Sequence, residues 1–302
     1  AIKKQSTVNV YDNPATDIQE GKVLVVGNCD DEKINASSIC CVNICNTTST
    51  CGCDPDSENL FKECEEDGCP PNEDKFDMPP IDWLSYYNKA KQAEFYGLCS
   101  VSGKKFYQEV ATTLSNKCIF TGQQFEDLWD KVGLGGTLIL EHKTNEFAIS
   151  TYYVEGGITV DWERHLKING VLVVDKSVYI GNWCNGYLVI NDPGPGIPSG
   201  LLTQGKMKFG GWFFFWGQDV DVEGLLYSNE EFTINGNPHI FTVVGGIIGR
   251  KFHFTYGWNN PLNIYLDNNI IKEGVWGGPQ PPVGELLEYS PVVTVEHWEE
   301  SY

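Results

Sequence analysis

Positive charge is scarce in this sequence of 302 residues, and arginine is the scarcest source of it. Lysine and arginine number 21 against 41 acidic residues, so the formal net charge is −20, and the only arginines are Arg164 and Arg250. A nucleic-acid binder needs a basic face that displaces counterions from phosphates, so we expect no nucleic-acid partner. An anionic membrane surface is disfavoured for the same reason. Neutral partners, such as an uncharged polysaccharide or another protein, remain open.

Long apolar runs and familiar catalytic motifs are missing too. No run approaches the roughly 18 apolar residues of a membrane-spanning helix, so we expect no membrane insertion of this chain. The five histidines show no H-E-x-x-H spacing, and there is no G-x-S-x-G turn or phosphate-binding loop. We therefore do not expect an enzyme. The chain begins at Ala1 without a signal-peptide pattern, and we expect it to be a processed or truncated form.

Cysteine, by contrast, is abundant and unevenly placed. Eight of the 11 cysteines lie between Cys29 and Cys69, in an acidic stretch poor in apolar residues. Their irregular spacings lack the paired C-x2-C knuckles of zinc sites, so we interpret them as disulfides formed in an oxidising compartment. The odd total leaves at least one thiol without a partner in the chain. The disulfide candidates are Cys29, Cys40, Cys41, Cys45, Cys51, Cys53, Cys64, Cys69, Cys99 and Cys118.

A short sequence pattern typical of strands recurs in residues 152–256. Its copies are aligned on Gly170, Gly224 and Gly246, and the residues at positions +1, +8 and +10 after each glycine are apolar. Short β-branched and aromatic runs split by Gly or Asn turns predict strands, and repeated strands without intervening helices predict a solenoid. The 22 residues that separate Gly224 from Gly246 suit one coil of three short strands. We predict a mainly β fold, a right-handed parallel β-helix, with an antiparallel β-sandwich as the alternative.

Two amphipathic helices are predicted ahead of the main repeats. The first covers residues 81–95, after Pro79-Pro80, and its expected apolar face consists of Ile81, Leu84, Tyr87, the Lys91 stem and Phe95. The second covers residues 123–132, after a capping box of Thr121 and Gln124. Its expected apolar stripe consists of Phe125, Leu128, Trp129 and Val132. We expect both helices to pack on the solenoid or to cover an open end of it.

These elements divide the chain into four parts. Residues 1–28 are expected to form the initial strands of the solenoid, and residues 29–75 a cysteine-rich, acidic, disulfide-bonded insertion. Residues 76–135 form a helical covering segment, and residues 136–302 the β-helix with a terminal strand. The segment 29–75 has too few apolar residues for a core of its own, so cross-links would replace packing there.

Three phrases resemble a family of bacterial extracellular proteins encoded with type IV pilus machinery, the PilX-like proteins. They are Pro-Pro-Ile-Asp followed by Tyr-Tyr in residues 79–87, Tyr-Tyr-Val-Glu-Gly to Val-Leu-Val-Val in residues 152–174, and Ser-Pro-Val-Val to His-Trp-Glu-Glu in residues 290–300. The resemblance runs from about Met78 to the end. It implies a β-helix related in architecture to the tāpirins, which are cellulose-binding surface adhesins. It also implies an extracellular or cell-surface location.

The aromatic run from Gly210 to Gly217 is the main candidate for a binding site. Alternation along a strand would place its two tryptophans and the middle phenylalanine on one face. Exposed rings of this kind stack well on the apolar faces of sugars. The alternative is that the Pro- and Gly-rich loop 191–204 folds over the rings. The candidate ligand-binding residues are Trp212, Phe214, Trp216, Tyr227 and Trp258.

Acidic residues at alternate positions offer the only candidate metal site. Asp219 and Asp221 would share a strand face, and such oxygen ligands could hold calcium, with a solvated outer face as the alternative. No other cofactor is expected. Together the observations predict an extracellular surface adhesin that binds a neutral insoluble polysaccharide, cellulose-like, through an aromatic platform. The alternatives are a structural subunit of a pilus or other filament, which would bind further subunits, and a β-helix glycan-active enzyme.

Overall fold

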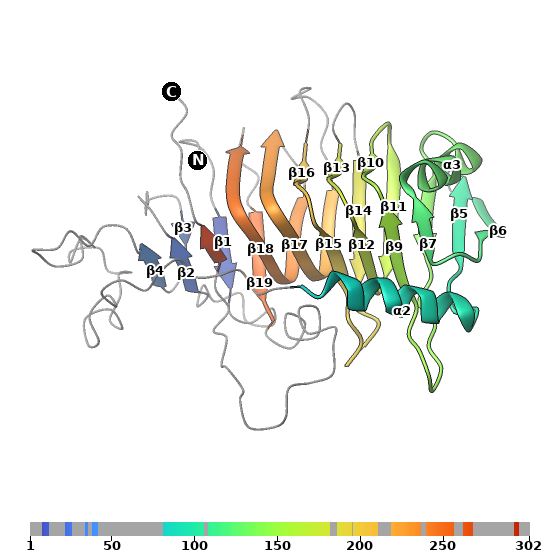
Figure 1. Ribbon diagram of the computed structural model, residues 1–302. Helices are drawn as coiled ribbons and strands as arrows, with labels where there is room; N and C mark the ends of the chain where they lie inside the picture. The colour runs from blue at the N-terminus through green and yellow to red at the C-terminus, as the bar shows by residue number, and fades with distance from the viewer. Residues whose placement is uncertain are drawn as a thin grey trace, which may run out of the picture.

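In the computed structural model of this protein, most of the described residues belong to one large, mostly parallel sheet (Figure 1). The continuous described ranges are 81–105, 108–181, 186–194, 196–210, 219–236, 240–256 and 262–267. Five short strands outside them are β1 (Val8–Tyr11), β2 (Lys22–Val25), β3 (Ile34–Asn35), β4 (Ser38–Cys41) and β20 (Val293–Val295). These residues contain two helices and a sheet of 17 strands. The mainly β prediction is confirmed.

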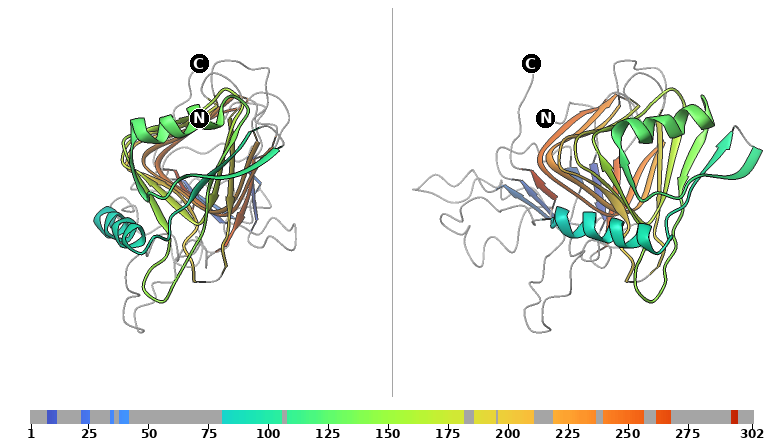
Figure 2. Two further views of the ribbon diagram at one scale, coloured as in Figure 1. Left: turned by 90° about the vertical axis from the view of Figure 1, so that its right-hand side faces the viewer. Right: turned by 45° about the vertical axis from the view of Figure 1, so that its right-hand side comes forward.

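The large sheet is arranged as three rows of parallel strands (Figures 1 and 2). The first row runs through β8 (Thr137–Leu140), β11 (Arg164–Asn169), β14 (Gly186–Asn191), the starts of β17 (Asp219–Gly236) and β18 (Ile240–Tyr256), and β19 (Leu262–Leu266). The second row runs through β7 (Ile119–Thr121), β9 (Thr151–Glu155), β12 (Val171–Val174), β15 (Gly200–Thr203) and the middles of β17 and β18. The third row runs through β10 (Ile158–Val160), β13 (Val178–Ile180), β16 (Met207–Phe209) and the ends of β17 and β18.

Apolar side chains of the three rows face a common interior. Successive side chains of a strand point to opposite faces, and in parallel register the inward residues of neighbouring strands lie directly over one another. The first row contributes the ladder Leu138, Leu166, Leu188, Val220 and Phe241, the second row Tyr152, Leu172, Leu201, Leu226 and Ile247, and the third row Ile158, Val178, Met207, Phe232 and Phe252. Every one of these side chains is buried, so the ladders form the core.

The register confirms part of the predicted repeat and corrects the rest. Val171 and Leu225 lie two strands apart in the same second-row ladder, through Gly200, as the alignment of Gly170 with Gly224 predicts. The alignment of Gly224 with Gly246 is wrong, because Gly224 pairs with Gly245. A register shift between Ser228 and Glu231 then moves the pairing by one more residue. A bulge of this kind inserts an unpaired residue that sequence periodicity does not reveal.

Helix α2 (Trp83–Phe95) lies lengthwise across the second row (Figure 1). Its 13 residues span about 20 Å, close to the roughly 19 Å covered by the four strand spacings from β17 to β7. Trp83 meets Tyr227 of β17 edge to face at 5.7 Å, and Tyr87 meets Tyr153 of β9 at 5.1 Å. At the other end, the Glu94 carboxylate accepts the backbone N–H of Cys118, at 2.8 Å. The helix therefore fastens strands that are far apart in the stack.

The face of α2 that packs on the sheet is only partly the predicted one, because Ile81 and Tyr87 pack as expected but Leu84 and Phe95 do not. The buried residues of the helix are Tyr86, Ala90 and Ala93, whereas Leu84 is 67% exposed and Phe95 83% exposed. Small alanines let the helix approach the apolar outer face of the second row closely, whereas Leu84 and Phe95 point away from it. The helix ends at Phe95 as predicted but begins two residues later than predicted, because Asp82 is the N-cap and accepts from the Ser85 N–H at 2.9 Å.

Helix α3 (Gly122–Val132) lies at the end of the stack, along one side of it, next to β7, β8 and β10 (Figure 2). Its predicted stripe is confirmed, because Phe125, Leu128, Trp129 and Val132 are all buried. The predicted capping box of Thr121 and Gln124 is present too. An open stack of strands exposes both apolar interior and unpaired edges, and α3 covers the interior at this end. Neither helix in the described part of the chain is long and apolar enough to cross a membrane.

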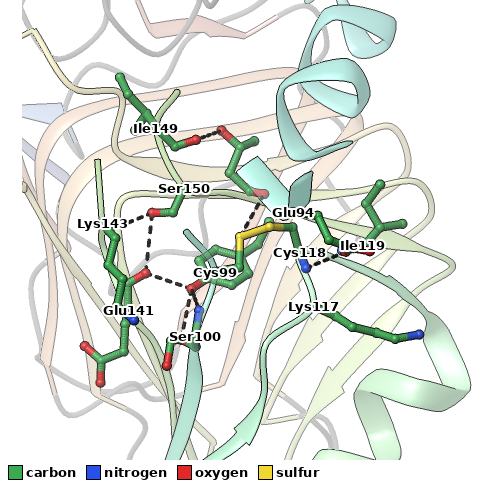
Figure 3. The surroundings of a disulfide bond; sticks show 12 residues. Glu94, Cys99, Ser100, Lys117, Cys118, Ile119, Glu141, Lys143, Ile149 and Ser150 are labelled. Atoms are coloured by element: carbon green, nitrogen blue, oxygen red, sulfur yellow. Dashed lines mark hydrogen bonds between the residues drawn. A yellow bond between two sulfur atoms is a disulfide. The ribbon is translucent and has the colours of Figure 1, made fainter. Parts of the chain in front are cut away.

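A disulfide joins the turn after α2 to the start of β7 (Figure 3). It links Cys99 to Cys118, which confirms these two of the predicted disulfide candidates. Between them the chain forms the antiparallel pair β5 (Val101–Lys105) and β6 (Gln108–Ser115), and β5 also pairs antiparallel with β8. The Tyr152 hydroxyl donates to the Glu141 carbonyl at 2.7 Å beside this link. The disulfide thus closes the base of a hairpin where the sheet changes from parallel to antiparallel pairing.

The first strand of the sequence does not lie at the start of the stack. Strand β1 pairs parallel with β19, in register from Val8 with Leu262, and β3 pairs with β1. The N-terminal strands therefore extend the first row at the end opposite to α3. Strands β2, β4 and β20 form a separate parallel sheet of three strands in the described residues. Segments from both chain ends thus lie together at this end (Figure 1).

The packing of α2 predicts different effects on stability for two substitutions, one from leucine to alanine and the other from alanine to leucine. Leu84→Ala removes an exposed side chain and is expected to change the free energy of unfolding by less than about 0.5 kcal/mol. Ala90→Leu forces extra methylenes between α2 and the second row and is expected to cost about 1–3 kcal/mol. Leucine and alanine have similar helix propensities, so propensity does not explain a difference. Denaturant unfolding measures both, and a larger cost for Leu84→Ala would contradict this placement of the helix.

Candidate functional site

The outer face of the first row, called the first-row face below, is the candidate functional surface. Among the described elements, α2 packs on the second row and α3 on the end of the stack, so neither helix lies on this face (Figure 2). Five strand spacings from β8 to β19 give it a length of about 24 Å. Its side chains are those that alternate with the buried interior ladders, and they form ladders of their own that run along the stack.

These outward ladders mix aromatic, amide and charged groups. The ladder at the start of the strands contains Thr137, His165, Tyr187, Asp219 and Ile240, the middle one Ile139, Lys167, Val189, Asp221, Thr242 and Asn263, and the third Asn169, Asn191, Glu223, Val244 and Tyr265. The strands of this face are parallel and in unbroken register from β8 to β19. Surfaces with rings, apolar side chains and hydrogen-bonding groups suit polymers with both apolar and hydroxyl faces.

A stacked pair of rings lies on the first-row face. The His165 and Tyr187 rings are 4.0 Å apart between centroids, with an angle of 18° between their planes. Burial lowers the pKa of His165 from its ordinary value, and the negative charges of Asp219 and Glu163 oppose this only in part. The imidazole is therefore neutral at pH 7. The pair places two uncharged aromatic rings side by side on a chain of strong net negative charge.

A ladder of hydrogen-bonded amides and a carboxylate follows the ends of the same strands. The Asn191 amide donates to Asn169 Oδ1 at 2.7 Å, and the Asn169 amide reaches Glu141 Oε2 at 3.5 Å. The Ser102 hydroxyl donates to the other oxygen of Glu141 at 2.8 Å. Each side chain thus holds the next in one orientation. A preset row of donors and acceptors binds hydroxyl groups with less loss of side-chain entropy than mobile side chains would.

An exposed tryptophan lies in the turn that leads into β11. Trp162 is 52% exposed and has φ of +58°, and Glu163 follows with φ of +61°. Two consecutive non-glycine residues in the left-handed region cost about 1 kcal/mol or more each. The next residue, Arg164, pairs with Glu126 of α3 at 2.9 Å and lies over the Trp129 ring at 5.4 Å. These contacts hold the strained turn in place at the edge of the first-row face.

The structure locates only some of the residues predicted as ligand contacts. Trp212, Phe214, Trp216 and Trp258 lie outside the described residues. Tyr227 is described, and its ring is 1% exposed beneath Trp83. It therefore cannot extend an exposed aromatic strip, because α2 covers the second row at this point.

The predicted calcium ligands lie on the first-row face. Asp219 is half-buried and Asp221 is exposed, on the same strand face as expected. Within the described ranges no group of three or more histidine, cysteine, aspartate or glutamate side chains is placed to hold a metal ion. Calcium at this position stays a prediction. The eight disulfide candidates from Cys29 to Cys69 have no described side chains.

Sequence reasoning missed the Asn ladder, although a signal for it was present. Leu-Lys-Ile-Asn at residues 166–169 and Leu-Val-Ile-Asn at residues 188–191 repeat the same phrase 22 residues apart. In a stack of coils, such a repeat places both asparagines at one register position. Trp162 carried no comparable signal, because left-handed turns at non-glycine residues have no reliable sequence pattern.

Comparison with known proteins identifies no relative. No protein-family model matches the chain, and neither a curated protein nor a solved structure matches it. Function must therefore be argued from the geometry of the described residues.

The ring stack predicts the titration of His165. Tyr187→Ala removes the ring that shields one side of the imidazole, so the pKa of His165 is expected to rise toward 6.5, its ordinary value. Proton NMR of the histidine ring as a function of pH measures the change. Tyr179→Ala, which removes a tyrosine from the outer face of the third row, is the matched control and should leave this pKa unchanged. An unaltered pKa in Tyr187→Ala would show that the stack does not bury His165.

Proposed function

We propose that this chain is an extracellular surface adhesin that binds a neutral, insoluble polysaccharide of the cellulose type along the first-row face. The observation that carries the proposal is the neutral His165–Tyr187 stack beside a hydrogen-bonded Asn ladder on a face that no described helix covers. The exposed Trp162 at the edge of this face supports it. The proposal moves the expected aromatic contacts from one run of the sequence to a surface built from several strands.

The chemistry of the face matches that of a linear neutral glycan. Sugar rings have apolar C–H faces that stack on aromatic rings, and their hydroxyl groups need donors and acceptors at the rim. The outward ladders run along the stack, so a polymer lying along it would meet a new row of side chains at every strand spacing of about 4.8 Å. Many weak, repeated contacts suit attachment to an insoluble surface, because avidity multiplies modest single-site affinities.

A right-handed parallel β-helix is the fold that we propose for this platform. Its support is the order of the three rows along the chain and the passage of β17 and β18 through all three. In the sequence, Trp212 and Trp216 precede β17 and Trp258 precedes β19, as Trp162 precedes β11. We include these tryptophans in the proposed contact set on that basis.

The compartment and the link to pilus machinery also belong to the proposal. The Cys99–Cys118 disulfide supports an oxidising, extracellular location. The association with type IV pilus machinery rests on the resemblance of three sequence phrases to PilX-like proteins.

A depletion assay with insoluble polymers tests the function. The chain is mixed with crystalline cellulose, xylan and chitin particles, and the protein left in solution is measured. We expect depletion by one polymer and a roughly tenfold or greater loss of affinity in Trp162→Ala/Tyr187→Ala, because each aromatic contact is worth about 0.5–1.5 kcal/mol. Melting temperatures verify that the variant folds.

The matched control removes two aromatic rings from elsewhere on the surface. Phe95 and Phe147 are 83% and 58% exposed, beside Tyr96, which stacks on Phe147 at 5.4 Å. Phe95→Ala/Phe147→Ala should bind as the parent does. Equal loss in both variants would indicate general adhesion of exposed rings, and no depletion by any polymer would refute the proposal.

A further inference from the structure

The outer face of the third row, called the third-row face below, has a charge balance opposite to that of the whole chain. Five cationic side chains, those of Lys176, Lys206, Lys208, Arg250 and Lys251, lie on it or at its border with the second row. Three carboxylates lie among them, those of Asp175, beside Lys176, and of Glu230 and Glu231. The chain as a whole has about twice as many acidic as basic residues. A local excess of cations on such a molecule is not what composition alone predicts.

The polar groups of this face are arranged in straight ladders. Thr159, Tyr179, Lys208, Thr233 and His253 lie at one register position of five successive strands. Their inward neighbours are the buried residues of the third-row core, so alternation points this ladder outward. Four strand spacings give it a length of about 19 Å. A second ladder beside it carries Lys206, Glu231 and Lys251.

Contacts within the second ladder hold Lys206 in place and favour its charged form. The Lys206 ammonium donates to Glu231 at 3.0 Å, and the Thr233 hydroxyl donates to the other oxygen of that carboxylate at 2.9 Å. The hydrogen bond and the charge of Glu231 raise the pKa of Lys206. Lys251 pairs in register with Glu231 on the other side. One carboxylate thus lies between two lysines, and the cations of the face outnumber the carboxylates.

We propose that the third-row face binds a linear anionic polysaccharide, one that carries carboxylate or sulfate groups along its length. The Thr159 hydroxyl, the Tyr179 phenol and the His253 imidazole contact the sugar rings, and Lys208, Lys251 and Arg250 contact the anionic groups. Thr233 of the same ladder is buried and holds Glu231 in place. This site is separate from the first-row face and does not depend on the proposed binding of a neutral polymer.

The net charge of the chain does not prevent such binding. At an ionic strength of about 0.1 M, charges more than about 10 Å away are largely screened, so a ligand on this face responds mainly to the local cations. Nucleic acid fits less well, because Glu230 and Glu231 interrupt the continuous positive surface that closely spaced phosphates need. A polysaccharide with one anionic group per sugar or fewer tolerates these two carboxylates.

Calorimetric titration of the full chain tests the site. The probes are size-defined oligogalacturonate and chondroitin sulfate oligosaccharides at about 0.1 M ionic strength. We expect one or both to bind, and binding to be lost at about 0.5 M salt because the Debye length then falls to a few ångströms. Lys208→Gln/Lys251→Gln should weaken binding by about tenfold or more, at up to about 1 kcal/mol for each exposed ion pair.

The control variant and two further probes decide the interpretation. Lys117→Gln/Lys143→Gln removes two exposed lysines from other parts of the molecule and should bind as the parent does. Binding of only the carboxylated or only the sulfated probe identifies the anionic group, and either result supports the site. The proposal is overturned if neither probe binds, if both variants lose affinity equally, or if duplex DNA of similar length binds as tightly. Depletion by cellulose should be unchanged in Lys208→Gln/Lys251→Gln, which separates this test from that of the first-row face.

Discussion

Parallel register between stacked strands is the constraint on which the rest of this structure depends. Backbone hydrogen bonds fix Leu166 against Leu188, and because side chains alternate, they also fix His165 against Tyr187 on the opposite face. A slip of one residue would turn the leucines outward and destroy both the core and the outer ladders together. Burial of the interior therefore stabilises the arrangement of the outer side chains, and the proposed binding faces need no scaffold of their own. This coupling explains why the outward groups form straight rows instead of scattered patches.

Stacking buries the strands against one another along the length of the stack. It leaves the two ends exposed, and also any outer face that is apolar. Each end exposes apolar interior and unpaired strand edges, and in the described part α3 covers one of them with Phe125 and Trp129. The outer face of the second row is apolar as well, and α2 covers it. The disulfide between Cys99 and Cys118 connects the two covering helices, because it links the turn after α2 to the strand before α3. With the second row covered and the end closed, the first and third rows are the faces left for ligands.

Much of the scaffold could be predicted because it depends on local chemistry. The capping box of Thr121 and Gln124 and the stripe of α3 follow from helix geometry alone, and the strand repeat from Gly170 to Gly224 follows from alternation. The face of α2 could be predicted only in part, because the deciding feature is close approach to a sheet, which favours Ala90 and Ala93 over Leu84. The alignment of Gly246 failed because the shift at Ser228 breaks the period. For the candidate site, the sequence predicted aromatic groups but neither the Asn ladder nor the pairing of His165 with Tyr187. That pairing depends on residues 22 apart in sequence meeting in space.

Composition determines the net charge of the chain, whereas strand register determines which charged side chains lie close together on its surface. A chain at −20 repels anions at long range, and this argues against partners recognised from a distance. At contact range the relevant quantity is the charge within about one Debye length, and strand register decides which side chains share that distance. Lys208 and His253 are 45 residues apart in sequence, yet they occupy one ladder because Lys208 pairs with Thr233 and Thr233 with His253. The same mechanism gathers neutral rings and amides on the first row. Two faces of one stack can therefore differ in the ligands that their side chains suit, although they share one core and belong to a chain of one net charge.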